Sequence, residues 1–214
     1  MAWHNKPAGG SWGWTEGSTE ADENALEICN ILRGRGWSDN AIAGVLGNIQ
    51  HEGLMNPWQW EGNNPLSIND TYDIEHSTSH GYGLTQFTPS GKYINSPYAQ
   101  ALSGYQPYFS DRTGGALEGE AQTIFIDEHA DYYPTTQFPI SYANFKIYTG
   151  TPAECAEIWW KNYERSGSPT FPTIRASSAN YYYNLITGTP YEDYHVPMYG
   201  FFLLKKRKRR GFDI

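Results

Sequence analysis

The sequence contains little cysteine and no long apolar run. Its two cysteines, Cys29 and Cys155, are too few for a disulfide framework or a zinc site, and both fall in segments with helical spacing, so we expect buried free thiols. The first six residues lack the apolar core of a signal peptide, and no stretch approaches the roughly 20 apolar residues of a membrane span. The sequence therefore predicts neither a disulfide-stapled domain nor a membrane-spanning one.

Basic residues are scarce outside one short segment. Residues 205–210 hold six of the fifteen lysines and arginines, and without residues 205–214 the chain carries nine basic against twenty-two acidic residues, a net charge of −13. An acidic body repels phosphate groups, which excludes nucleic acid as its main partner. Leucine and valine are few, whereas 16% of residues are aromatic. Many tyrosines and tryptophans are typical of a carbohydrate- or peptide-binding surface, and equally of an aromatic core.

Apolar residues at helical intervals predict several helices. The first is expected from about residue 22 to 33, and others over about 118–130 and 172–188. Thr151 and Glu154 have the spacing of a capping box with a proline at the first helical position, which predicts a further helix that begins there.

Residues 54–117 interrupt this helical pattern. They are rich in Asn, Gly, Pro, Ser, Tyr and Trp without a regular period, which predicts a short hairpin and long loops of the kind that often carry function. The predicted fold is α+β and mainly α, with this loop or hairpin insert as one wall of a cleft. We divide the chain into an N-terminal arm (1–21), one domain (22–188) and an apolar and basic tail (189–214).

The clearest predicted helix begins after Ser38, a natural N-cap, and ends at Gly53. Its apolar stripe consists of Ile42, Val45, Leu46 and Ile49. Glu52 lies at the edge of this stripe in the last turn, where burial and the negative end of the helix dipole both disfavour a carboxylate. A carboxylic acid that keeps its proton near neutral pH is what cleavage of a glycosidic bond requires. From spacing alone, a solvated glutamate at a helix end is an alternative interpretation.

A glycine turn follows about thirty residues later, where residues 81–89 read Gly-Tyr-Gly-Leu-Thr-Gln-Phe-Thr-Pro. Its two glycines permit a tight turn, and the amide of Gln86 offers donors and an acceptor to sugar hydroxyls or N-acetyl groups. Alone, this segment predicts only a hairpin.

Together, the two segments resemble phage tail lysozymes, which belong to the lysozyme-like superfamily with goose-type lysozymes and lytic transglycosylases. The blocks that carry the resemblance are residues 43–57, which include Gln50-His51-Glu52-Gly53-Leu54, and residues 81–93, with residues 151–167 in support. The resemblance covers roughly residues 22–188.

This resemblance implies a lysozyme-like fold and a peptidoglycan-degrading glycosidase. Such a muramidase cleaves the β-1,4 bond between N-acetylmuramic acid and N-acetylglucosamine and needs no cofactor. By resemblance, Glu52 is the general acid, and Gln86 with the backbone around Gly83 is the turn that lines the sugar cleft. Aromatic rings are expected to offer stacking faces to the sugars, namely those of Trp58, Trp60, Tyr82 and Tyr93.

The identity of a second carboxylate stays open. An inverting hydrolase needs a base about 6.5–9.5 Å from its acid. Three candidates lie between Glu52 and the glycine turn, of which at least two are expected to be solvated loop acids: Asp70, Asp73 and Glu75. A lytic transglycosylase uses no such base. We expect Glu164 to be structural, as a buried partner of Arg165 or of another cation.

A catalytic metal is not expected. His76 and His80 share a loop with Glu75, which is a pattern that a metal site can have. However, His51 and Glu52 do not form the zinc motif H-E-x-x-H, because position 55 is Met.

The resemblance also implies a place in the virion, as a phage tail component that acts on the host cell wall, with peptidoglycan and other tail proteins as partners. Residues 198–204 are apolar but too short to span a bilayer, and the basic run follows them. Residues 198–210 are therefore candidates for contact with an anionic membrane surface, an acidic partner or a neighbouring subunit, with a solvated tail as the alternative. Two other functions remain open: a lytic transglycosylase and a non-catalytic glycan-binding tail component.

Overall fold

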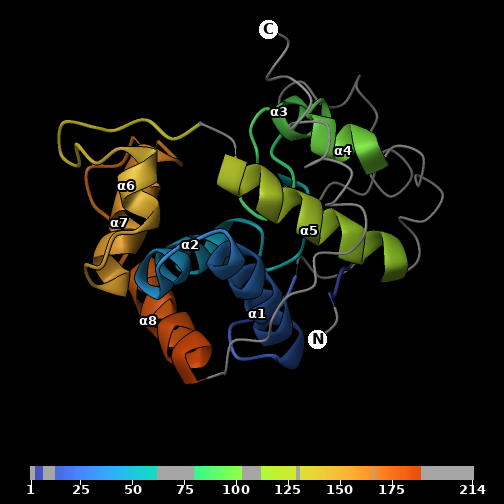
Figure 1. The fold of residues 1–214 in the computed structure, drawn as a ribbon, viewed down its shortest axis with the longest axis horizontal. Helices are drawn as coiled ribbons and strands as arrows, with labels where there is room; N and C mark the ends of the chain where they lie inside the picture. Colours follow the sequence, from blue (N-terminus) through green and yellow to red (C-terminus); the bar gives the residue numbers. More distant parts are fainter. Residues whose placement is uncertain are drawn as a thin grey trace, which may run out of the picture.

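The structure, a computed structural model, describes residues 3–6, 13–61, 80–102, 112–128, 131–165 and 167–188. These residues form a mainly helical protein, as predicted (Figure 1). Its helices are α1 (Thr19–Gly34), α2 (Asp39–Glu52), α3 (Gly91–Ile94), α4 (Pro97–Leu102), α5 (Arg112–Glu128), α6 (Tyr142–Lys146), α7 (Pro152–Asn162) and α8 (Thr173–Gly188). Within the described residues, β structure is limited to isolated bridges from Tyr82 to Trp60 and to Phe87.

Two helices begin with the capping interactions that the sequence predicts. The Ser38 hydroxyl accepts a hydrogen bond from the amide of Ala41, and α2 ends at its C-cap Gly53. At α7, the capping box is confirmed, since the Glu154 amide donates to the Thr151 hydroxyl at 3.2 Å and the Thr151 amide donates to the Glu154 carboxylate at 2.7 Å.

The prediction of long loops over residues 54–117 is wrong in part. The short helices α3 and α4 lie in this segment, and α5 begins at Arg112, earlier than expected. A helix of one or two turns is too short to show a hydrophobic period, which explains why α3, α4 and α6 are not evident in the sequence. Residues 62–79 and 103–111, which belong to the segment with the predicted hairpin and loops, lie outside the described residues.

Helix α2 lies at the centre of the domain, between α7 and α8 on one side and α1 and α5 on the other (Figure 1). Two glycines permit its close packing. A Cβ atom on Gly44 would lie 2.5 Å from the Cβ of Cys155 in α7, and one on Gly47 would lie 2.7 Å from the backbone nitrogen of Ala179 in α8. Real Cβ atoms do not approach other atoms so closely, so both neighbouring helices depend on glycine at these positions.

The aromatic residues form much of the core. The Trp37 ring makes edge contacts with Tyr142 and Phe145 and a tilted contact with Trp159. A second group lies beside α5 and consists of Tyr82, Phe87, Tyr93 and Phe125. The composition allowed either a binding surface or an aromatic core, and most of these rings lie in the core. Cys29 and Cys155 are buried free thiols, as predicted.

The described part of the N-terminal arm packs on the domain. Trp3 and Trp14 are buried, Trp3 lies against Gly119 of α5, and the Trp14 amide donates to the carbonyl oxygen of Leu54 at 3.0 Å. The predicted tail, residues 189–214, lies outside the described residues.

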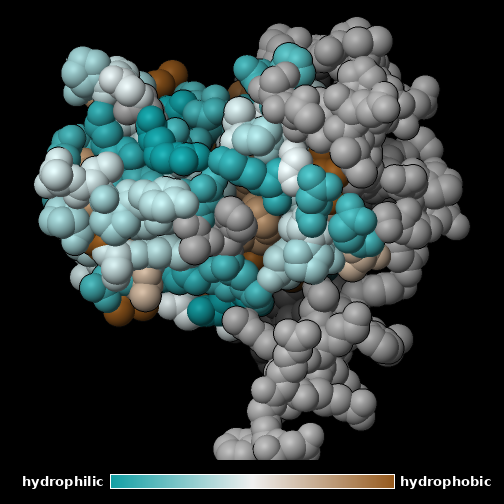
Figure 2. Space-filling view, turned by 90° about the horizontal axis from the view of Figure 1, so that it is seen from above, coloured by the Kyte–Doolittle hydropathy of each residue, from teal (hydrophilic) through white to brown (hydrophobic). Residues whose placement is uncertain are grey.

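The face seen in Figure 2 is predominantly hydrophilic wherever it consists of described residues, and hydrophobic side chains emerge on it only in small, separate areas. Among the described helices, none is long and apolar enough to cross a membrane.

We predict that Gly47→Ala destabilises the protein, although alanine is favoured over glycine in a helix by about 1 kcal/mol. The added methyl group would overlap backbone atoms of α8, which cannot rotate away as a side chain can. Overpacking of this kind costs about 1–3 kcal/mol or more, so we expect a net loss measurable as a lower melting temperature. Gly167→Ala is the control, because a Cβ atom there meets nothing within 4 Å. Equal stability of the two variants would contradict the tight packing of α2 on α8.

We also predict that Thr151→Ala lowers the free energy of unfolding by about 1 kcal/mol, because it removes the side-chain acceptor at the start of α7. Urea denaturation measures this change. Thr151→Ser, which keeps the hydroxyl, should retain most of the stability, and an Ala variant as stable as the parent would show that the cap contributes nothing.

Candidate active site

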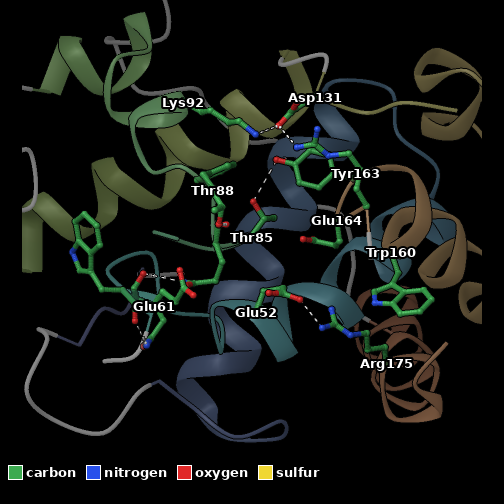
Figure 3. Close-up of a pocket in the computed structure, with 15 residues that line it drawn as sticks. Glu52, Glu61, Thr85, Thr88, Lys92, Asp131, Trp160, Tyr163, Glu164 and Arg175 are labelled. Atoms are coloured by element: carbon green, nitrogen blue, oxygen red, sulfur yellow. Dashed lines mark hydrogen bonds and ion pairs between the residues drawn. The ribbon is translucent and has the colours of Figure 1, made fainter. Parts of the chain in front are cut away.

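A cavity of about 520 Å³ opens where α2 ends (Figure 3). Its walls come from the end of α2, the glycine turn, α3, the end of α7 and the start of α8. Glu52, Glu164 and Arg175 line one part of it, while Lys92 and Asp131 lie at the other end. Segments that are far apart in the sequence thus contribute charged groups to one space.

The two segments that carry the family resemblance are in direct contact. A Cβ atom on Gly53 would lie 2.5 Å from the carbonyl oxygen of Leu84 and 2.6 Å from that of Gly83. Gly83 itself has a φ of +83°, and its own Cβ atom would lie 2.4 Å from the amide oxygen of Gln122. That oxygen accepts a hydrogen bond from the Leu84 amide at 2.8 Å. The end of α2 and the turn therefore form one unit that only glycine at these positions permits.

Gln86 lies in the turn and lines the cavity. Its side-chain nitrogen donates to the carbonyl oxygens of Gln59 and Gly83, each at 3.0 Å. Its φ is +47°, a left-handed conformation that is uncommon for a residue with a side chain. The sequence predicted an amide free to offer both donors and an acceptor. Instead, the donors hold the turn together, and the side-chain oxygen is the atom left for a ligand among the contacts of the described residues.

Glu52 is paired with an arginine. Its side chain is 24% exposed, and its carboxylate accepts a hydrogen bond at 2.5 Å from Arg175, whose side chain is 13% exposed. Arg175 also donates to the side-chain oxygen of Asn48 at 3.0 Å. Asn48 is fully buried and donates to the carbonyl oxygens of Gly44 and Ala156, so it is fixed in orientation. Arg175 is thereby held by two residues one helical turn apart on α2.

Glu164 brings a second carboxyl group to the same part of the cavity (Figure 3). It lies just after α7, and the indole nitrogen of Trp159 donates to it at 3.1 Å. Burial raises the pKa of Glu164, and the negative charge of Glu52 acts in the same direction, while Arg175 opposes both. A raised pKa favours the protonated form of this side chain at neutral pH.

Glu164 was predicted to be the partner of Arg165 or of another cation. No ion pair joins it to Arg165 in the structure, although the charges of Arg165 and Arg175 both act on it. Arg165 contacts Asp131 at 3.4 Å, and the same carboxylate oxygen accepts from Lys92 at 2.8 Å. The ion pair between Lys92 and Asp131 connects α3 with the opposite wall of the cavity. The hydroxyls of Thr85 and Tyr163, 3.4 Å apart, connect the glycine turn with that wall.

Of the four aromatic residues predicted to stack on sugars, only one lines the cavity. Trp60 lines the cavity, although only 5% of it is exposed, and Trp58 is buried outside it. Tyr82 and Tyr93 have no exposed surface, so the expectation that they stack on sugars is corrected: their rings stack on each other in the core, with 6.2 Å between the ring centroids.

The remaining predictions cannot be placed, because Asp70, Asp73, Glu75 and His76 lie outside the described residues. His80 is exposed, and its ring nitrogen lies 4.0 Å from the carboxylate of Glu61. In the described part of the chain, no group of three or more His, Cys, Asp or Glu residues has a metal-binding arrangement.

Sequence reasoning missed Arg175 and the arrangement of Glu164. No spacing rule connects Arg175 with Glu52, since more than a hundred residues separate them and only the packing of α8 on α2 brings them together. One signal was available. Asn48 precedes Glu52 by four residues on the same face of α2, and a polar residue inside an apolar stripe indicates a polar partner.

A helical domain with two carboxyl groups beside an arginine in one cavity has the parts needed for acid–base chemistry. Comparison with known proteins agrees with a helical domain of this chemistry. The sequence model of the phage tail lysozyme family matches residues 23–186. The chain therefore belongs to the phage tail lysozyme family.

A relative is Morphogenesis protein 1 of Bacillus phage B103, to which the chain is 30% identical over 174 residues. The match covers 79% of this chain and 40% of that protein, so the chain spans well under half of the relative's length.

We predict that Gln86→Glu lowers stability at pH 7 by about 1–3 kcal/mol, because it replaces a donor with a charged acceptor that faces two carbonyl oxygens. The loss should shrink as the pH falls, since a protonated carboxyl group can donate one of the two hydrogen bonds again. Gln86→Met is the matched neutral variant, and its loss should not depend on pH. Melting temperatures over a pH series test this. A Gln86→Glu protein as stable as the parent at pH 7 would show that the amide nitrogen does not face these carbonyls.

Proposed function

We propose that this protein is a peptidoglycan-degrading glycosidase, a muramidase that cleaves the β-1,4 bond between N-acetylmuramic acid and N-acetylglucosamine. The observation that carries the proposal is the position of Glu52, at the end of α2 in a cavity whose opposite wall is the glycine turn. Membership of the phage tail lysozyme family supports the substrate, which the cavity alone does not specify. A lysozyme-like fold, with the segment after α2 as one wall of the cleft, is part of this proposal.

In the proposed reaction, Glu52 protonates the oxygen of the scissile bond, and the bond from that oxygen to the anomeric carbon breaks. The oxygen of Gln86 is placed to accept a hydrogen bond from a substrate N–H group, such as that of an N-acetyl substituent. Water then adds to the anomeric carbon. A lytic transglycosylase would instead let a hydroxyl of the sugar itself attack, and this alternative uses the same acid.

A non-catalytic glycan-binding tail component is the third candidate. The presence of both Glu52 and Gln86 in the cavity favours an enzyme over this alternative. We further propose that the protein acts from the virion, on the host cell wall, and that other phage tail proteins are its neighbours. The family and the morphogenesis protein among its relatives support this location. Contact of residues 198–210 with a membrane surface or an acidic partner belongs to the same proposal.

We predict that Glu52→Gln lowers turnover of peptidoglycan by about two to four orders of magnitude, the usual contribution of a general acid. The variant should fold, because the exchange is nearly isosteric and a carbonyl oxygen can still accept the hydrogen bond from Arg175. Glu157→Gln, the same exchange on α7 outside the cavity, is the control and should keep full activity. Near-parental turnover in a folded Glu52→Gln protein would exclude Glu52 as the acid.

Mass spectrometry of the products distinguishes the three candidates in the same experiment. A hydrolase leaves a reducing end, a transglycosylase leaves a product lighter by one water, and a binding component leaves the glycan intact. Amide exchanges at three further positions, made one at a time, test for a base in the unplaced segment: Asp70, Asp73 and Glu75. One large loss would identify a base there, whereas three small losses would leave that role to another group.

A further inference from the structure

The carboxyl groups that line the cavity outnumber its cations by four to three: Glu52, Glu61, Asp131 and Glu164 against Lys92, Arg165 and Arg175. Arg175 is paired with Glu52, and Lys92 and Arg165 are both engaged by Asp131. Glu164 receives a hydrogen bond from an uncharged indole, and no cation among the described residues forms an ion pair with it. Arg175 is hydrogen-bonded to Glu52, whereas its charge and that of Arg165 act on Glu164 without an ion pair. With both groups as carboxylates, the lining of the cavity carries an excess negative charge, and one proton on the pair removes that excess.

This arrangement conflicts with the role of Glu52 taken alone. A general acid must hold a proton before it reacts, and a carboxylate paired with arginine has none to give. Of the two carboxyl groups, Glu52 is paired with the cation, whereas Glu164 accepts a hydrogen bond from the Trp159 indole. Both side chains line the same part of the cavity (Figure 3). The proton that Glu52 delivers therefore has a source beside it.

We propose that Glu164 is the second functional carboxyl group of this site, which holds the shared proton in the resting protein and supplies it to Glu52. This inference rests on the proposed function. It assigns the role of base to Glu164, whereas the candidates from the sequence lie in residues 62–79. In this proposal, Glu164 has two roles: it acts on the substrate through Glu52 as the store of the proton, and it is the base that accepts the proton of the incoming water.

The proton completes a closed cycle. The O–H bond of Glu164 breaks as an O–H bond forms on Glu52, and Glu52 then transfers the proton to the glycosidic oxygen, whose bond to the anomeric carbon breaks. Water, or a sugar hydroxyl in the transglycosylase, forms a new bond to that carbon and gives its own proton to the Glu164 carboxylate. The site returns to its starting state with one proton on the pair, and no other reactant is needed.

The other titratable groups around Glu52 and Glu164 have hydrogen-bond partners of their own or a pKa that keeps them neutral. Tyr163 is buried, and burial raises the pKa of its hydroxyl above the ordinary value. His51 on α2 lies within 3.0 Å of the Ser178 hydroxyl, and burial followed by the charge of Arg175 lowers its pKa, which favours the neutral ring. Glu61 lines the cavity and accepts from the backbone amide of Gly81. These contacts leave Glu52 and Glu164 as the two groups that exchange the proton.

We predict that Glu164→Gln lowers turnover at pH 7 by about 10- to 100-fold and changes its pH profile. The variant lacks the buried carboxyl group whose raised pKa keeps a proton in the site near neutral pH. The limb of the profile on which activity falls with rising pH should therefore move to lower pH by about one unit or more. A merely structural role would lower activity without moving this limb. Glu157→Gln is the control and should keep the parental profile.

A second measurement does not depend on activity. With ¹³C-labelled glutamate, NMR should show Glu52 and Glu164 titrating as a coupled pair, each responding to two steps. In Glu52→Gln, which abolishes turnover, Glu164 should titrate in a single step.

The outcomes separate this inference from the proposed function. If Glu52→Gln is inactive while Glu164→Gln keeps the parental rate and profile, the shared proton is overturned and the glycosidase stands. A parent without activity on peptidoglycan but with coupled titration overturns the glycosidase and supports the pair. Should Glu164→Gln not fold, an independent single-step titration of Glu164 in the parent would overturn the inference by itself.

Discussion

The whole site depends on how closely other segments approach α2. Gly44 admits α7, Gly47 admits α8, and Gly53 admits the glycine turn, each at a distance that a methyl group would prevent. Each of these neighbours then supplies one polar group to the cavity: Glu164 follows α7, Arg175 begins α8, and Gln86 lies in the turn. Close backbone packing around one helix therefore determines the geometry of groups that are distant in sequence. A shift of any neighbour by the width of a methyl group would separate atoms that now form hydrogen bonds.

This packing carries polar groups into the interior, where each needs a partner. Asn48 shows how the requirement is met. Its amide nitrogen satisfies carbonyl oxygens on α2 and α7, and its oxygen accepts from Arg175 on α8. One buried side chain thus joins three helices and orients the arginine that contacts Glu52. An apolar residue at this position would satisfy none of these groups, so the polar interruption of the apolar stripe is a requirement of the site.

Local signals in the sequence were sufficient for part of this structure. The extent of α2 and the capping box at Thr151 follow from spacing and residue type, and the structure contains both. The contribution of Gln86 to the cavity follows from the family resemblance, and Gln86 lines the cavity. The short helices α3 and α4 could not be predicted, because so few residues show no period. Composition was ambiguous for the aromatic residues, and rings expected at the surface, such as that of Tyr82, lie in the core. The pairing of Glu52 with Arg175 depends on tertiary packing, and Asn48 in the apolar stripe indicates only that a polar partner exists, not which residue it is.

In the proposed mechanism, the pairing of Glu52 with Arg175 has two consequences for the transfer of the proton. When Glu52 gives up its proton, it becomes a carboxylate, and Arg175 is already in position to stabilise the charge that develops. An arginine placed in this way favours the state in which the proton has left over the state in which it is still bound. The same interaction disfavours the protonated acid before the reaction, so the proton must be kept by another group nearby. Glu164 meets this need because it lies in the same cavity, away from the arginine's hydrogen bonds and beside an uncharged donor. Separating the group that stores the proton from the group that delivers it lets the site stabilise the product of the transfer without losing the proton to solvent beforehand.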